Sequence, residues 1–230
     1  ERGSFMKKAV SLIFTFLILF SLAVSVNAEE FNGANLFTID LPEEFQRNED
    51  SSSDFSFVNA AGDTVTVTYI DNPQEENIFS PADMSKKDIE DYTKTISEEA
   101  EAVMKEQTDV FKLRYLDCEK IKHKSGKTAL VSHIETTIEL NGRKGVYYQT
   151  IYEFGGADYK YSFTFTTEDN EKLNSMNDVF DTINILEAET ESNLDKLTGY
   201  AVAGGLALLI FAGIIRFIRT PEKRTKGKLK

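Results

Sequence analysis

The sequence has one cysteine, two histidines and no tryptophan. An internal disulfide is excluded because Cys118 has no second cysteine to pair with. His123 and His133 are the only histidines, which is too few for most histidine-based catalytic and metal-binding sites. The composition therefore excludes a domain held together by internal disulfides and disfavours histidine-based catalysis.

Positive charge is scarce in the middle of the chain. The whole chain carries a formal charge of -12; since residues 1–28 carry +2 and residues 216–230 carry +6, residues 29–215 carry -20. Nucleic-acid binding needs clustered Lys and Arg that displace counterions from phosphates. The acidic middle stretch therefore argues against nucleic acid as a partner.

The N-terminus has the features of a secretory signal peptide. The basic pair Lys7 and Lys8 is followed by eighteen uncharged residues, and a small residue, Ala28, ends the segment. This pattern predicts a signal peptide over 1–28 with cleavage after Ala28. The alternative is an uncleaved N-terminal anchor. We interpret residues 1–5, which precede a methionine, as upstream sequence translated by mistake.

A second apolar run, from Leu197 to Ile215, contains nineteen uncharged residues. At the helical rise it spans about 28 Å, close to the hydrocarbon thickness of a bilayer. We predict a single transmembrane helix over 197–218 and a basic tail over 219–230. By the positive-inside rule the tail is cytoplasmic and everything before the helix is extracytoplasmic. The basic residues expected to anchor the cytoplasmic side are Arg216, Arg219, Lys223 and Arg224.

Two other interpretations of this C-terminal end remain open. A sortase-anchored tail also ends in an apolar run and a basic cluster, but of its Leu-Pro-x-Thr-Gly motif only Thr198 and Gly199 are present. Within the predicted membrane helix, Gly199, Ala203 and Ala207 lie four residues apart on one face. This spacing of small residues suggests a weak homodimer contact through the membrane helix.

Residues 29–186 have the length of one domain, without an internal repeat or a Pro-rich linker, and residues 187–196 form a short acidic linker. Alternating apolar residues bounded by turn dipeptides predict an α+β fold with an antiparallel sheet of six to seven strands. The last four strands are expected to form a meander because Asn-Gly and Gly-Gly pairs separate them. The expected strands are 36–41, 55–58, 64–69, 111–121, 128–140, 145–154 and 159–167.

Two helices are expected beside this sheet. The first begins at Ser85, forms a capping box with Asp88 and continues to about Gln107. Its acidic outer face is typical of solvated surface, with a cation or partner site as the alternative. The second begins near Thr167. It is expected to place four apolar residues on one face: Leu173, Met176, Phe180 and Ile183.

Two segments carry a family resemblance. The opening segment is Phe-Thr-Ile-Asp-Leu-Pro-Glu-Glu-Phe at 37–45, and an alternating strand, Tyr-Ser-Phe-Thr-Phe-Thr-Thr at 161–167, precedes the closing helix. Together with the order of elements they resemble the PsbP-like superfamily (PsbP/DcrB-type secreted domains) over about 35–186. The resemblance implies an α/β/α sandwich with a non-enzymatic binding or assembly role, and it supplies no catalytic residues. A photosynthetic role is not expected, because the domain is acidic and its anchor is C-terminal.

Motifs for chemistry are sparse. Gly126-Lys127-Thr128 ends like a phosphate-binding loop, but Ile121 stands where the motif needs its first glycine, so a hairpin turn is expected. A metal site is the alternative for Cys118, His123 and His133, whose side chains can bind metal ions. We expect no catalytic residues, no cofactor and no metal.

Tyrosines gather on the last two expected strands. Tyr148 and Tyr152 share one face of their strand, since they are four residues apart, and they are the best candidates for partner binding. Ordinary packing under the helices is the alternative.

The sequence thus favours a membrane-anchored extracytoplasmic binding or assembly module of the bacterial envelope, non-catalytic and of unknown ligand. The alternatives are a cell-surface hydrolase with paired carboxylates and a sensor whose tail contacts a cytoplasmic partner.

Overall fold

The computed structural model describes residues 28–49, 53–72 and 79–187. The predicted signal peptide up to position 27, the predicted membrane helix and the basic anchor residues at 216–224 lie outside this part of the chain. Within the three described ranges, no helix is both long and apolar enough to cross a membrane.

The largest element is a seven-stranded antiparallel sheet, which confirms the predicted α+β class and strand number. Its strand order is β3-β4-β5-β9-β8-β7-β6. Strands β6 to β9 form the predicted meander. The strands are β3 (Gln46–Arg47), β4 (Phe55–Val58), β5 (Thr64–Asp71), β6 (Val110–Lys122), β7 (Thr128–Leu140), β8 (Arg143–Gly155) and β9 (Tyr159–Thr167).

A second, smaller sheet has the order β1-β2-β10 and contains both ends of the described chain: β1 (Ala28–Gly33), β2 (Phe37–Pro42) and β10 (Asn184–Ile185). The expected opening strand at 36–41 therefore exists as β2, but it does not belong to the main sheet. Its inward residues Phe37, Ile39 and Leu41 are buried, and Phe37 packs edge-on against Phe163 of β9. The small sheet thus lies against the main one.

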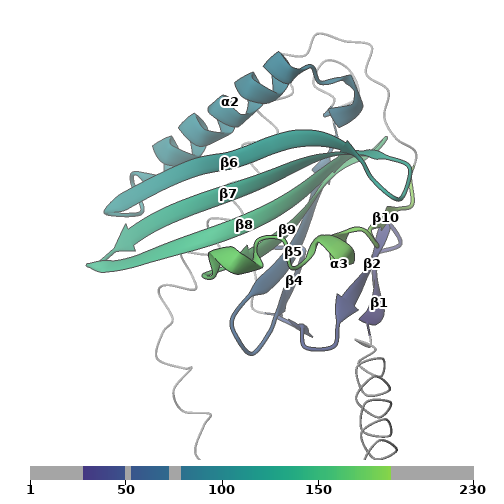
Figure 1. Cartoon of the computed structure of the whole chain (residues 1–230), viewed down its shortest axis with the longest axis horizontal. Helices are drawn as coiled ribbons and strands as arrows, with labels where there is room; N and C mark the ends of the chain where they lie inside the picture. The colour runs from purple at the N-terminus through teal and green to yellow at the C-terminus, as the bar shows by residue number, and fades with distance from the viewer. Residues whose placement is uncertain (1–27, 50–52, 73–78, 188–230) are drawn as a thin grey trace, which may run out of the picture.

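One long helix, α2 (Lys86–Met104), confirms the first predicted helix. Ser85 accepts a hydrogen bond from the Asp88 backbone N–H, and the Asp88 carboxylate accepts one from the Ser85 N–H, so the predicted capping box is present. The helix runs along β6 on one face of the sheet (Figure 1). Its buried side chains pack on β6, β7 and β8, and they are Tyr92, Ile96, Ala100 and Met104.

The predicted closing helix is wrong. The segment after β9 contains only a 3₁₀ turn, η2 (Asn170–Lys172), and one turn of helix, α3 (Asn177–Phe180). Polar side chains in it bond locally and compete with a continuous helix: Ser175 donates to the Lys172 carbonyl, for example. The burial prediction was nonetheless correct, since Leu173, Met176, Phe180 and Ile183 are all buried.

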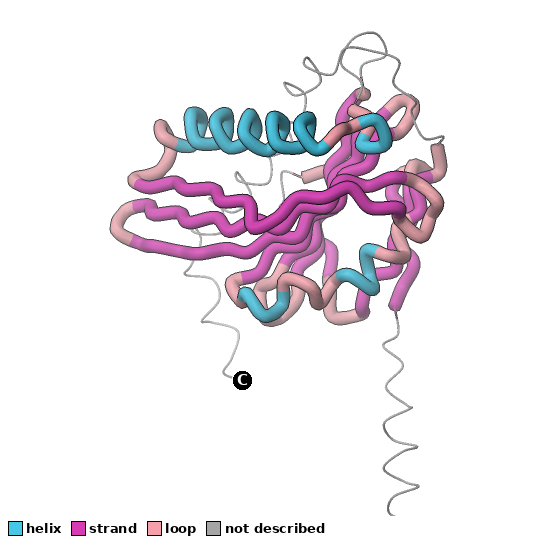
Figure 2. The backbone as a smooth tube through the Cα atoms, turned by 45° about the horizontal axis from the view of Figure 1, so that its top comes forward, coloured by secondary structure: helices cyan, strands magenta, loops and turns pink. Residues whose placement is uncertain are grey.

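The layers differ from the α/β/α sandwich that the resemblance implied. Figures 1 and 2 show α2 on one side of the main sheet, with η2, α3 and the small sheet on the other. A short 3₁₀ turn, η1 (Pro81–Asp83), precedes α2. The largest core lies between the two sheets and is rich in Phe. One face is therefore covered by a helix and the other by a second sheet with short turns.

Candidate functional site

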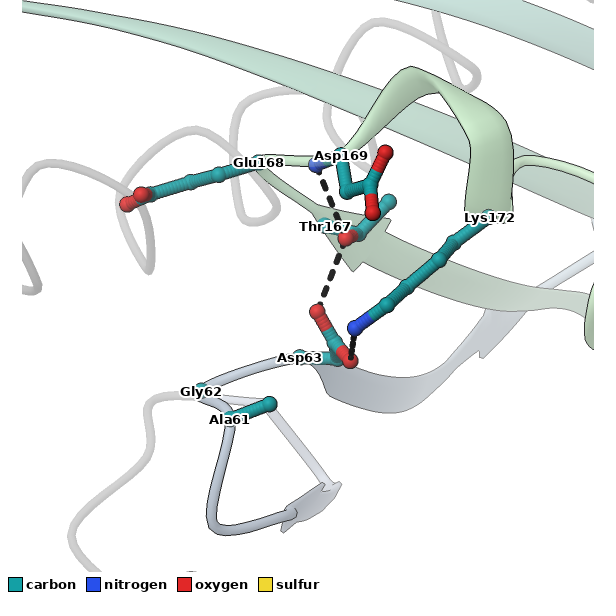
Figure 3. A pocket seen from close by; sticks show the side chains of 7 residues that line it. All are labelled: Ala61, Gly62, Asp63, Thr167, Glu168, Asp169 and Lys172. Carbon is teal, nitrogen blue, oxygen red and sulfur yellow. Dashed lines mark hydrogen bonds and ion pairs between the residues drawn. The ribbon is translucent and has the colours of Figure 1, made fainter.

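A small pocket of about 190 Å³ opens where the β4–β5 turn meets the end of β9 (Figure 3). Chain segments more than 100 positions apart meet here, because β5 and β9 are antiparallel neighbours with Thr64 opposite Thr166. The pocket is lined by Ala61, Gly62, Asp63, Thr167, Glu168, Asp169 and Lys172.

Asp63 lies at the centre of this pocket and is 7% exposed. Its carboxylate accepts hydrogen bonds from Lys172 Nζ at 2.8 Å, from Thr167 Oγ1 at 2.8 Å and from Asn59 Nδ2 at 3.1 Å. The backbone N–H of Asp63 in turn donates to the Asn59 side-chain oxygen at 2.9 Å. The carboxylate is therefore held in place by three donors from three segments.

These donors also fix the protonation state of Asp63. Burial alone would raise its pKa, but hydrogen bonds from Lys172, Thr167 and Asn59, together with the positive charge of Lys172, outweigh burial and lower it. A carboxyl group with a lowered pKa stays ionised at neutral pH. Asp63 is thus suited to hold an ion pair and unsuited to donate a proton.

The two other acids of the pocket are directed elsewhere. Asp169 caps η2 by accepting a hydrogen bond from the Glu171 N–H at 3.0 Å. Glu168 is exposed and extends away from Asp63 (Figure 3). The three carboxylates therefore do not face one another as a general acid and base would.

A row of polar side chains leads from the pocket across the sheet face opposite α2. Thr167 lies opposite Tyr148, which lies opposite Glu135, which lies opposite Arg114, one residue from each of β9, β8, β7 and β6. Arg114 donates to Glu135 at 2.9 Å. We call these four residues the polar row. The row joins the pocket to the charged edge of the sheet.

The two tyrosines proposed as partner-binding residues share this face, as their spacing predicted, but differ in exposure. Tyr152 is 5% exposed and packs edge-on against Phe180 of α3 at 5.0 Å between ring centroids. Tyr148 is half-buried and belongs to the polar row. Tyr152 therefore has the packing role that was its alternative, and partner binding by Tyr148 stays a prediction.

Cys118, His123 and His133, the three possible metal ligands of the sequence, each have separate contacts in the structure. His123 is buried, and its ring nitrogens contact Ser125 Oγ at 2.8 Å and the Phe180 carbonyl at 2.9 Å. Burial raises the pKa of Cys118 to about 12, so its thiol stays protonated. His133 pairs with Asp117 at 2.6 Å. In the described ranges, no three His, Cys, Asp or Glu side chains gather in a way that could hold a metal ion.

The sequence did not indicate a buried ion pair between β8 and β9. Lys160 is fully buried, and its Nζ lies 2.8 Å from the carboxylate of Glu153. The Tyr92 hydroxyl of α2 donates to the same carboxylate at 2.7 Å, and Lys160 lies 3.9 Å above the Phe79 ring. Burial lowers the pKa of Lys160, while the charge of Glu153 acts in the opposite direction. The only sequence signal was a glutamate inside an apolar strand, between Tyr152 and Phe154.

Comparison with known proteins finds similar structures but no similar sequences. No protein-family model and no curated protein matches the sequence. The structure is similar to the solution structure of cyanobacterial PsbP (CyanoP) from Synechocystis sp. PCC 6803, with a TM-score of 0.44 and 9% identity, over 71% of this chain and 95% of that one.

Two further solved structures are similar at the same level. The Saccharomyces cerevisiae Ran-binding protein Mog1p has a TM-score of 0.43 and 9% identity, over 71% of this chain and 97% of that one. A protein from Bacteroides thetaiotaomicron VPI-5482 has a TM-score of 0.43 and 12% identity, over 69% of this chain and 48% of that one.

Proposed function

We propose that this protein is a membrane-anchored extracytoplasmic binding or assembly module of the bacterial envelope, without a catalytic role. In this proposal residues 1–28 direct export and are removed after Ala28. The helix at 197–218 holds the folded domain outside the membrane, and the tail at 219–230 is cytoplasmic. These assignments rest on the hydropathy and charge pattern of the sequence.

The observation that carries the non-catalytic part is the state of Asp63. A hydrolase with paired carboxylates needs one carboxyl group whose pKa is raised so that it can donate a proton. Asp63 is the most buried acid of the pocket, and its pKa is lowered by three hydrogen-bond donors. The geometry therefore supports a structural role for Asp63, in which its ion pair with Lys172 holds the β4–β5 turn in place, more than it supports the hydrolase alternative.

For the binding part we propose that the polar row contacts a partner. Tyr148 offers a large contact area at low entropic cost, and Arg114 and Glu135 beside it supply directional polar contacts. Arg114 remains 64% exposed at its side chain despite its ion pair with Glu135. The row thus combines an aromatic residue with accessible charge on one sheet face.

Topology is tested first, in a Cys118→Ser background of the full chain. A membrane-impermeant maleimide is expected to label Lys94→Cys on α2 in intact cells, and to label Lys226→Cys in the tail only after permeabilisation. The reverse labelling pattern would contradict the proposed orientation.

Partner binding is tested with a photo-cross-linking amino acid placed at Tyr148 in the full chain in its native membrane. The matched control carries the same amino acid at Lys94, which is exposed on the far face of α2. We expect a discrete cross-linked envelope protein from position 148 and none from position 94. Equal cross-linking at both positions, or none at 148, would reject the polar row as the contact surface.

A further inference from the structure

The last described residue, Glu187, lies beside one hairpin of the main sheet. Lys127, in the turn between β6 and β7, donates a hydrogen bond from its Nζ to the Glu187 carbonyl. The Glu187 carboxylate accepts hydrogen bonds from the Asp158 N–H at 2.8 Å and from the Tyr161 hydroxyl. Figure 1 shows the β6–β7 hairpin at the same end of the main sheet as β10, and the β7–β8 hairpin at the opposite end. The chain therefore leaves the described domain at the β6–β7 end.

This exit point decides which end of the domain lies nearer the proposed membrane helix. Nine residues, 188–196, separate Glu187 from Leu197, and at full extension they span about 30 Å. Strand β7 has 13 residues, so the two ends of the sheet are about 43 Å apart. The β7–β8 hairpin can approach the membrane only if this linker is stretched, whereas the β6–β7 hairpin can do so with a slack linker.

The β6–β7 hairpin tip, residues 120–128, carries the densest positive charge of the acidic stretch. It contains four lysines, at 120, 122, 124 and 127, and no acidic residue, whereas residues 29–215 as a whole carry -20. Lys122 is exposed, and the side chain of Lys124 is 70% exposed. An anionic surface repels most of the domain and attracts this tip. The charge distribution thus favours one orientation of the domain on such a surface.

Hydrogen bonds hold the hairpin tip in one conformation. His123 is buried, and its ring nitrogens contact Ser125 Oγ and the Phe180 carbonyl. The His123 N–H donates to the Lys127 carbonyl at 2.9 Å, and the Gly126 N–H donates to the His123 carbonyl at 2.9 Å. Gly126 has a φ of 85°, and a side chain at this position would meet nothing within 4 Å. The turn therefore projects into open space and presents its lysines there.

One acid lies close to the tip. Lys124 Nζ is 2.6 Å from the carboxylate of Asp181. An exposed ion pair of this kind is weak, so a lipid phosphate can replace Asp181 as the partner of Lys124 at little cost. Lysine binds phosphate as a compact point charge. Each lysine close to an anionic bilayer favours the bound state roughly fivefold.

We propose that the β6–β7 hairpin tip docks on anionic lipid headgroups of the membrane that anchors the protein, through Lys122 and Lys124. Docking directs the β7–β8 hairpin away from the bilayer. This inference rests on the proposed function, because it requires the membrane helix at 197–218, and it adds a second contact between the protein and the membrane.

The first experiment maps the accessibility of lysines in the full chain in lipid nanodiscs. One set of nanodiscs contains phosphatidylcholine alone, and the other also contains phosphatidylglycerol. An uncharged acetylating reagent modifies exposed lysines, and mass spectrometry measures the rate at each position. We expect Lys122 and Lys124 to react more slowly, by about fivefold or more, in the nanodiscs with phosphatidylglycerol. Lys144, which is exposed beside the β7–β8 turn, is the matched control and should react equally in both.

The second experiment follows the orientation of the domain by energy transfer from a dye on Lys94→Cys, in the Cys118→Ser background, to an acceptor on the lipid. Adding phosphatidylglycerol is expected to change the transfer efficiency. Lys122→Gln with Lys124→Gln should abolish that change. Arg143→Gln with Lys144→Gln removes the same charge at the other hairpin and should preserve it. All four positions are exposed, so thermal unfolding should show the same Tm for both double variants.

Equal acetylation of Lys122 in the two kinds of nanodisc would overturn the inference. A change in energy transfer that both double variants lose, or that neither loses, would do the same. Protection of Lys122 in both kinds of nanodisc that disappears in Glu189→Gln with Glu191→Gln would also overturn it, because the acidic linker would then be the partner of the hairpin.

Failure of this inference can be told from failure of the proposed function. A chain that does not insert into nanodiscs contradicts the proposed membrane anchor, and the docking with it. A chain that inserts but shows no protection of Lys122 contradicts the docking alone.

Discussion

The buried pair Glu153–Lys160 gives the sharpest test of how the helix α2 is held on the sheet. Replacing Lys160 with Met removes the positive charge from a site where Lys160 is fully buried and the Glu153 side chain is 8% exposed. The Glu153 carboxylate then keeps the Tyr92 hydroxyl as its remaining side-chain hydrogen bond. A buried charge that loses its partner is strongly unfavourable, so we expect a large loss of stability at neutral pH.

The magnitude follows from this change. Removing one partner of a buried ion pair typically costs about 3 to 5 kcal/mol. Replacing both partners, as in Lys160→Met with Glu153→Leu, is expected to cost much less, because no buried charge is left over. Tyr92→Phe removes one hydrogen bond to a charged group and should cost about 1.5 to 3 kcal/mol. The double variant should therefore be more stable than Lys160→Met alone.

The assay is urea unfolding of the full chain in detergent micelles, followed by circular dichroism at neutral pH. The exposed pair Lys124–Asp181, at 2.6 Å, supplies the control: Lys124→Met should barely change stability. A loss of less than about 1 kcal/mol for Lys160→Met, or a double variant no more stable than Lys160→Met, would refute the reasoning.

Two further predictions concern the pocket and the last residue of β8. Because the pKa of Asp63 is lowered, its ion pair with Lys172 stabilises the fold above pH of about 3.8 and is lost as the pH falls through the lower folded value. Asp63→Asn should thus be less stable than wild type at pH 7, and acid titration should show the difference vanishing at low pH; a constant difference would contradict this. Gly155→Ala places a methyl group against the Phe79 carbonyl oxygen and should cost about 3 kcal/mol or more, measured by urea unfolding. Gly142→Ala meets open space at a φ of 72° and should cost about 1 kcal/mol, so similar losses for the two variants would argue against the close approach at Gly155.

The meander was predictable from the sequence because its signals are local. Alternation along each strand and turn dipeptides such as Asn141-Gly142 placed β6 to β9 within about two residues of their observed bounds. The helix α2 was equally local, since its capping box involves Ser85 and Asp88 alone. Apolar spacing after Thr167 fitted a helix but did not require one. Burial of those residues depends only on which of them are apolar, so that part of the prediction held.

The candidate site was less predictable because its contacts are distant in sequence. Asp63 and Lys172 are 109 positions apart, and no pattern near either residue indicates the other. Tyr148 was proposed for partner binding because it is a tyrosine on the same strand face as Tyr152, and that role stays a prediction. The burial of Tyr152 could not be anticipated, since it depends on α3 crossing that part of the sheet with Phe180. Local periodicity therefore predicts the strands, whereas the residues that cover each sheet face are known only from the tertiary structure.

The small sheet imposes an order on folding. Strand β2 has its first neighbour, β1, close by in the chain, but its second neighbour, β10, follows after the whole main sheet. The Asp40 N–H donates to Thr182 Oγ1 at 2.9 Å across 142 positions of sequence. Closing so long a loop is costly before other contacts have formed. The small sheet can therefore be completed only after the main sheet has formed, when residues near Ile185 pair with β2.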